Sequence, residues 1–457
     1  MDRTSRKPSL SLVLSVIAGL IAVFVPSANA QPAAVCTPTI DGPIAVTADS
    51  KPYERVAIPQ AGAVEEEFFV SCDVKAGHYK TLIHVRLPKA PVQQSGIVIA
   101  EPWHGGNLWT LYAKTSEYDA RAGHVAVIIV GSPRVLDNSI KKSNPSRYAS
   151  LTLPAGAQIK TGTSTQDATE LEVLGQVGLL IKKGGIPGVK ARKVILGGMS
   201  QTGGVTRAYI TYEHSGAGAK SVYDGYFPMQ SAVSSYATSI PDLDVPVVEV
   251  QGERELIDVR VRAGADHIIY RRPDGALYRL YEVAGMPHVQ TRGRGEDNVG
   301  DYGCKGRTLS DYPLFYVYAA SLDNLIGWVD KGVPAPHVSW IETNQNGSEI
   351  KRDSFGNALG GYRLSYVDVP IATYHSTWAD YVMTPNGPSD PEAARCDRIG
   401  WMTPLPPEQL KKLYPTHEDY VRKVNDSLKS LVAARLLLFE DAKALADEAS
   451  AARVPGP

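Results

Sequence analysis

The sequence predicts an α/β fold in which helices flank a mostly parallel central sheet. Apolar runs of strand length alternate with stretches of helical periodicity, which favours parallel strands joined by crossover helices. Several of these runs end in glycine, carboxylate or histidine residues, as is typical of the edge of a parallel sheet where ligands bind. The chain of 457 residues is long enough for one enlarged domain, which we expect over residues 31–457.

The first thirty residues have the pattern of a cleavable signal peptide. Its parts are a basic start (Arg3, Arg6 and Lys7), an apolar core (residues 10–25) and a small-residue cleavage site (residues 28–30). The apolar core is short for a bilayer span, so export is favoured over a membrane anchor. Cleavage would leave Gln31 as the mature N-terminus of a periplasmic or secreted protein without a membrane span.

The leading strands of the sheet are expected to be antiparallel, around residues 68–71 and 79–85, where short apolar runs alternate with turns. Five later apolar runs predict the parallel strands, at residues 96–101, 125–131, 193–197, 245–250 and 277–283. A helix is expected over Ala168–Lys183, ahead of the strand at 193–197.

Three further segments complete the predicted organisation. Residues 132–165 are rich in Ser, Pro, Lys and Gly and are a candidate cap or lid over the site. Residues 314–331 predict an amphipathic helix. Residues 333–457 are interpreted as a C-terminal extension packed on the body, with two helices between residues 407 and 452 that break around residues 413–415.

Ser200 is the candidate nucleophile. It follows an apolar run between Gly198 and Gly203, and a tight strand-to-helix turn of this kind holds a hydroxyl clear of the backbone. The usual elbow is G-x-S-x-G, whereas here Thr202 occupies the place of the second glycine and Gly203 comes one residue late. The alternative interpretation is an ordinary turn in which Ser200 caps a helix.

A carboxylate and a histidine follow Ser200 in the order that a serine elbow requires. Gly252, Glu253 and Glu255 come after the run at 245–250, and His288 comes after the next run. Glu255 is the predicted acid because it lies three residues after Gly252, where the loop should turn toward the histidine. Glu253 is the alternative acid.

Two donors are needed for the oxyanion of a tetrahedral intermediate. The backbone N–H of Gln201, directly after the nucleophile, is one candidate. The other is expected from His104-Gly105-Gly106, which follows the strand at 96–101, so Gly105 and Gly106 are the predicted residues. A plain glycine turn is the alternative.

These motifs resemble those of the secreted bacterial "alpha/beta hydrolase domain-containing protein" family. The resembling segments are residues 144–148, 198–203, 279–285 with His288, Trp328, Gly332, 353–363 and 413–421. The resemblance covers nearly all of the chain after residue 30. It implies an α/β-hydrolase fold with Ser200 and His288 at the catalytic positions. The family's T-E-x-D segment aligns its aspartate with Glu255 and its threonine with Gly252, so the chain departs from it twice there. The sequence His104-Gly105-Gly106 also differs from the family's usual text.

The four cysteines, Cys36, Cys72, Cys304 and Cys396, all follow the leader. An even number in an oxidising compartment indicates two disulfides, and among the three possible connectivities we pair Cys36 with Cys72 and Cys304 with Cys396. No pair has C-x-x-C spacing, so no metal site is predicted. Residues 353–357 are expected to form a structural turn, because they lack the alternating carboxylates of a calcium loop.

The sequence thus predicts an exported serine hydrolase that cleaves a carboxylic ester through an acyl-enzyme on Ser200. No cofactor is required, and the expected substrate is a small-molecule or polymeric ester. The 47 basic residues nearly balance the 48 acidic ones, which gives no reason to expect nucleic acid as a partner. An amidase or peptidase with the same residues, and a non-catalytic binding protein on the same scaffold, are the alternatives.

Overall fold

The fold is given by a computed structural model, which describes residues 36–53, 63–105, 111–214, 222–235, 240–263, 268–289, 306–345, 347, 349–378, 383–384, 387–388, 396 and 398–455. The predicted signal peptide, Gly106 and Cys304 lie outside these residues. The chain divides into two units, Met1–Cys36 and Thr37–Pro457, and the fold below is that of the second. No described helix combines the length and the apolar character needed to cross a membrane.

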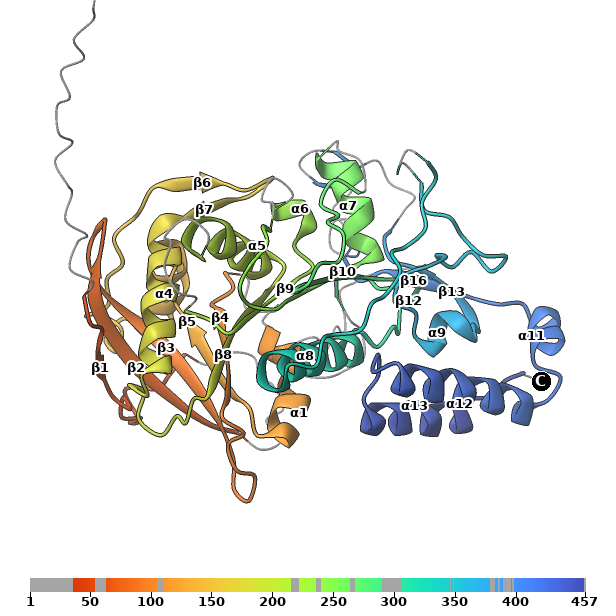
Figure 1. The fold of residues 1–457 in the computed structure, drawn as a ribbon, viewed down its shortest axis with the longest axis horizontal. Coiled ribbons are helices and arrows are strands. Elements are labelled where there is room, and N and C mark those ends of the chain that lie inside the picture. Colours follow the sequence, from red (N-terminus) through yellow and green to blue (C-terminus); the bar gives the residue numbers. More distant parts are fainter. Residues whose placement is uncertain are drawn as a thin grey trace, which may run out of the picture. The chain divides into compact units, whose positions relative to one another are not determined.

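A nine-stranded sheet lies at the centre of this unit (Figure 1). Its strands, in spatial order, are β1 (Thr39–Asp41), β2 (Ala63–Val74), β3 (Gly77–Pro88), β5 (Val125–Ile129), β4 (Ile97–Pro102), β8 (Lys193–Met199), β9 (Gly225–Met229), β10 (Val247–Gly252) and β11 (Tyr278–Val283). The neighbours from β1 to β5 pair antiparallel, and those from β5 to β11 pair parallel. The predicted α/β class with a mostly parallel sheet is therefore confirmed.

The five predicted parallel strands lie where the apolar runs indicate them, and β2 and β3 are longer than expected at twelve residues each. Sequence analysis missed β9, which is fully buried between β8 and β10. Its five residues include Gly225 and Pro228, two residue types that are depleted in strands. Burial on both faces outweighs that local preference.

Helices cover both faces of the sheet, with α4 and α5 on one face and α1 and α8 on the other (Figure 1). The helices are α1 (Leu111–Ala122), α2 (Pro133–Val135), α3 (Lys141–Ser143), α4 (Ala168–Lys182), α5 (Gln201–Tyr209), α6 (Ala232–Ser235), α7 (Glu253–Ala263), α8 (Leu314–Lys331) and α9 (Ser365–Asp368), with π-helical turns η1 (Leu136–Ile140) and η2 (Ile210–His214). The remaining strands form small sheets: β6 (Gln158–Lys160) with β7 (Thr165–Asp167), β14 (Met383–Thr384) with β15 (Gly387–Pro388), and β12 (Thr308–Leu309) with β16 (Trp401–Pro404) and β13 (Ala372–His375).

The C-terminal segment contains three helices, so the prediction of two is wrong. They are α11 (Pro407–Leu413), α12 (His417–Ala433) and α13 (Phe439–Ala451). The predicted break after residue 413 is present, and a second break follows α12. There Arg435 has a φ of 60°, and the N–H of Leu436 donates to the Leu431 carbonyl. A left-handed residue of this kind ends a helix, although the apolar run after it continues the helical pattern.

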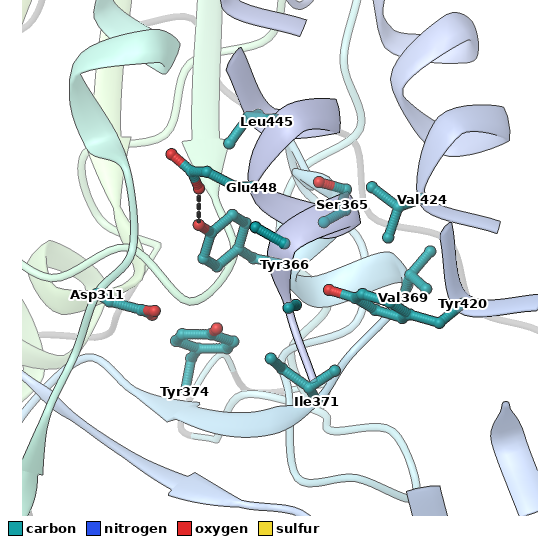
Figure 2. Close-up of a pocket in the computed structure, with 13 residues that line it drawn as sticks. Asp311, Ser365, Tyr366, Val369, Ile371, Tyr374, Tyr420, Val424, Leu445 and Glu448 are labelled. Carbon is teal, nitrogen blue, oxygen red and sulfur yellow. Dashed lines mark hydrogen bonds between the residues drawn. The ribbon is translucent and has the colours of Figure 1, made fainter. Parts of the chain in front are cut away.

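A cavity of about 370 Å³ lies among α9, β13, α12 and α13 (Figure 2). Tyr366, Tyr374 and Tyr420 line it together with aliphatic residues of the two helices. The Tyr366 hydroxyl donates to Oε2 of Glu448 on α13 at 2.9 Å, which ties α9 to the C-terminal helices.

Candidate active site

Ser200 lies in a sharp turn between β8 and α5. Its backbone has φ 59° and ψ −119°, a left-handed conformation that residues other than glycine rarely adopt. The turn is held from both sides, because the Ser200 N–H donates to the Met229 carbonyl at 2.9 Å and the Gly204 N–H donates to the Ser200 carbonyl at 3.0 Å. The Ser200 side chain makes no capping bond to α5, which does not support the interpretation as a helix cap.

The glycines around Ser200 are required by close packing, which explains the departure from the usual elbow motif. A Cβ on Gly198 would lie 2.3 Å from the Thr202 carbonyl oxygen, and one on Gly203 would lie 2.5 Å from that of Met229. Thr202 is accommodated because its hydroxyl accepts from the Met199 N–H at 3.0 Å and donates to the Met199 carbonyl at 2.9 Å. The second glycine is therefore needed at Gly203, one residue later than in the usual motif, because α5 packs against β9 there.

His288 lies between Ser200 and Glu255. Its Nε2 is 3.0 Å from Ser200 Oγ, and its Nδ1 is 2.5 Å from Glu255 Oε1. These residues come from the C-terminal ends of β8, β11 and β10, and the imidazole and the carboxylate are buried. The structure therefore brings together the three residues that the sequence singles out.

The alternative acid, Glu253, does not approach His288. Its Oε2 accepts from the Gly285 N–H and its Oε1 pairs with Arg352, both at 2.8 Å. The prediction of a loop at this point is wrong, since both glutamates lie in the first turn of α7. Gly252 makes room for that geometry: its N–H donates to Glu255 Oε2 at 2.9 Å, and a Cβ there would lie 2.8 Å from the same oxygen.

Burial controls the protonation of the His288–Glu255 pair. It lowers the pKa of His288 well below 6.5, with a further contribution from the positive charge of Arg398. It also raises the pKa of Glu255 to about 7, against the opposing effects of Arg254 and the Gly252 N–H. At neutral pH the imidazole is therefore neutral and able to accept a proton.

Gln230 is a member of the site that sequence analysis missed. It follows β9 with a φ of 44°. Its Nε2 donates to the Pro287 carbonyl at 2.9 Å and to Glu255 Oε2 at 3.4 Å, while the Tyr318 hydroxyl of α8 donates to its Oε1. Gln230 thus connects the acid, the loop that carries His288, and α8. No motif marks it, because the strand before it was not recognised.

The predicted oxyanion residues are partly described. Gln201 is the first residue of α5, where backbone N–H groups lack partners within the helix. Gly105 lies beside it, since a Cβ on Gly105 would be 3.3 Å from Gln201 Oε1. Gly106 lies outside the described residues, so its role stays a prediction.

A cavity of about 400 Å³ opens at Ser200 and His288. Its described lining residues are His104, Gly105, Arg134, Thr163, Ser164, Ser200, Gln201, Gln230, Val233, Ser234, Asp258, His288 and Arg398. Arg134, Thr163 and Ser164 belong to the predicted cap, residues 132–165. Sequence analysis missed Arg134, Asp258 and Arg398, because nothing in their local sequence distinguishes them from surface charges.

The remaining predicted features lie away from this cavity. Cys36 and Cys72 are disulfide-bonded, in agreement with the predicted pairing, and so is Cys396. Its predicted partner Cys304 lies outside the described residues, so that pairing stays a prediction. The turn expected at residues 353–357 is present, with Asp353 Oδ1 accepting the N–H groups of Phe355 and Asn357 at 2.9 Å each.

Several solved structures of esterases and a hydrolase are similar to this chain. Among solved structures, the chain is similar to brefeldin A esterase, described as a bacterial homologue of human hormone-sensitive lipase, with 12% identity, a TM-score of 0.31, and coverage of 44% of this chain and 64% of that one. It is also similar to the esterase Est22 (12% identity, TM-score 0.32, 49% and 73%) and to dienelactone hydrolase from Anabaena variabilis (14%, 0.29, 48% and 85%). The chain thus covers less than two thirds of brefeldin A esterase.

Comparison with curated protein sequences finds no match. The family model described as "alpha/beta hydrolase domain" matches residues 40–447. That match spans most of the chain, and the sheet with its serine turn fits it, so the chain belongs to the α/β-hydrolase domain family.

Proposed function

We propose that the protein is an exported serine hydrolase that cleaves carboxylic esters. The observation that supports this most strongly is the hydrogen-bonded chain from Ser200 through His288 to Glu255, next to a cavity. The order of the three residues and the turn at Ser200 are typical of serine hydrolases. The export part of the proposal rests on the sequence of residues 1–30.

In the proposed mechanism, neutral His288 accepts the Ser200 proton at Nε2 while Ser200 Oγ attacks the ester carbonyl carbon. Glu255 orients the ring through Nδ1 and stabilises the imidazolium that forms. The backbone N–H of Gln201, with a second donor from Gly105 or Gly106, holds the oxyanion.

Collapse of the tetrahedral intermediate breaks the bond to the leaving oxygen, and His288 returns its proton to the departing alcohol. Water then attacks the acyl-enzyme while His288 again takes a proton, and the acid is released as Ser200 regains its hydrogen. Every proton is thus moved by one imidazole. Residues 132–165 are proposed to cap the cavity.

The test compares Ser200→Ala with the control Ser430→Ala, which removes an exposed hydroxyl on α12. Ser200→Ala should fold normally, lose ester hydrolysis by several orders of magnitude and fail to react with a fluorophosphonate probe. The control should behave as wild type. Near-native turnover by Ser200→Ala would refute the proposal.

Two alternative functions are separated in the same experiment. Matched p-nitrophenyl esters and p-nitroanilides of the same acyl group distinguish an esterase from an amidase or peptidase. A binding protein without catalysis would show neither turnover nor covalent labelling of Ser200.

A further inference from the structure

The described residues that line the cavity at Ser200 include few apolar side chains. Among its described lining residues, Val233 alone is aliphatic, and most of the others carry a hydroxyl, an amide, an imidazole or a charge. A site for a long acyl chain needs a mostly apolar lining, because that burial supplies the binding energy. The lining therefore favours a short, polar substrate.

Arg134 brings a positive charge close to the proposed oxyanion residues. Its Nη2 lies 3.4 Å from the position of a Cβ on Gly105, and that same position lies 3.3 Å from Gln201 Oε1. The guanidinium is exposed, and no hydrogen bond or ion pair joins it to another described residue. It is thus available to a ligand in the cavity.

Glu170, whose carboxyl group feels the charge of Arg134, does not neutralise that charge. Glu170 is buried, and burial raises its pKa to about 8, although the charge of Arg134 acts in the opposite direction. At neutral pH Glu170 is therefore mostly uncharged. Glu170 therefore contributes little negative charge beside Arg134.

A second arginine lines the same cavity from a different part of the chain. Arg398 precedes β16, and its charge helps to lower the pKa of His288. Arg254 and Lys114 act on His288 in the same direction, and Asp258 acts against them. Asp258 is itself ion-paired with Arg254 at 2.7 Å. Among these four charges that act on His288 from outside its pair with Glu255, the positive ones therefore outnumber the negative one.

We propose that the substrate is an ester that also carries a free carboxylate, which Arg134 and Arg398 bind beside Ser200. This inference rests on the proposed esterase function. Guanidinium groups bind carboxylates through paired, charge-assisted hydrogen bonds, and a cavity with two of them selects an anionic ligand over its neutral analogue. A monoester of a dicarboxylic acid has this chemistry; its hydrolysis consumes one water and yields the dicarboxylate and an alcohol.

The test uses two esters that differ only in charge: the 4-nitrophenyl monoester of glutaric acid and its methyl-capped analogue. Wild-type kcat/KM should favour the free acid by about tenfold or more, mainly through KM, and the preference should shrink as salt rises. Arg134→Ala and Arg398→Ala should each reduce the ratio, Arg134→Lys should retain part of it, and Arg134→Glu should reverse it.

Two further arms locate the carboxylate and control for general effects of charge. The pair 4-carboxyphenyl acetate and phenyl acetate places the carboxylate on the alcohol side instead of the acyl side. Arg422→Ala, on the exposed face of α12, removes a positive charge far from the cavity and should leave every ratio unchanged. A preference in either pair that depends on Arg134 and Arg398 supports the inference.

A readout without turnover separates this inference from the proposed function. Glutarate should slow fluorophosphonate labelling of Ser200 in wild type, and less so in Arg134→Ala. If Ser200 is labelled but glutarate has no effect and neither charged ester is preferred, the inference is wrong and the proposed function stands. If Ser200 is neither labelled nor needed for hydrolysis, the proposed function fails, and the inference fails with it.

Discussion

Glu255 and His288 lie in direct contact, with 2.5 Å between Oε1 and Nδ1, and both side chains are buried. Glu253, only two residues earlier, is directed to Arg352 and the Gly285 N–H instead. The first turn of α7 therefore directs its two carboxylates to different partners. Glu255 contacts the histidine, and Glu253 contacts the neighbouring loops.

Replacing these two glutamates one at a time tests that separation. Glu255→Gln should lower kcat for a short ester on the order of 10²–10⁴-fold, because the amide does not stabilise an imidazolium. Glu253→Gln should lower the melting temperature, because it leaves Arg352 without its buried partner, and should change kcat far less. Steady-state kinetics and thermal unfolding of both variants provide the measurement; similar losses of kcat would contradict the assignment.

The pH dependence of ester hydrolysis should follow from the two shifted pKa values. Activity requires the deprotonated form of both groups, a neutral His288 and an ionised Glu255. Since burial holds the pKa of His288 well below 6.5 and raises that of Glu255 to about 7, activity should be lost as the pH falls through the higher value, near 7, and should be kept above it. In Glu255→Gln the acidic limb of kcat/KM should move below pH 6.5. An acidic limb that stays near pH 7 in Glu255→Gln would contradict its assignment to the Glu255 carboxylate.

Gln230 should act as a positioning residue for the acid. Gln230→Glu sets a second carboxylate near Glu255 Oε2, which is 3.4 Å from the Gln230 amide, and like charges raise a pKa. The acidic limb of the pH–rate profile should therefore move upward and kcat should fall, with little change in KM. Gln94→Glu is the matched control, since Gln94 bonds Gly188 and Lys190 outside the site. A lower melting temperature with an unchanged pH profile would indicate a structural role only.

The four cysteines should form two disulfides, Cys36–Cys72 and Cys304–Cys396. Thiol titration under denaturing, non-reducing conditions should find no free thiol, and peptide mapping should recover the two linked pairs. Loss of a native disulfide costs about 2–5 kcal/mol in a small secreted domain, and the loss is less visible in a large one. Recovery of a Cys36–Cys304 or Cys72–Cys396 peptide would exclude the predicted connectivity.

Sequence analysis located the parts of this molecule that local pattern determines. The apolar runs mark five parallel strands, and the order of Ser200, Glu255 and His288 follows from the strands that precede them. The spacing from Gly252 selected the glutamate that contacts the histidine, although the segment is a helix and not a loop. Local sequence was sufficient because these residues lie next to strand ends, where the fold itself sets their position.

The parts that sequence analysis missed depend on contacts between distant segments. β9 is a strand because β8 and β10 enclose it, against the preferences of Gly225 and Pro228. Arg134 and Arg398 are 264 positions apart in the sequence, and both line the same cavity in the folded chain. Neither neighbourhood carries a local mark of the site, because only folding of the chain brings these two arginines to the cavity.

The left-handed backbone of Ser200 lowers the stability of the native state. A non-glycine residue with a φ of 59° costs ~1–3 kcal/mol, which exceeds the ~0.5–1 kcal/mol that the extra freedom of a glycine costs. Ser200→Gly should therefore melt above wild type, whereas Ser200→Ala keeps the Cβ and the cost. Under the proposed function, the turn at Ser200 therefore gives up thermostability for reactivity.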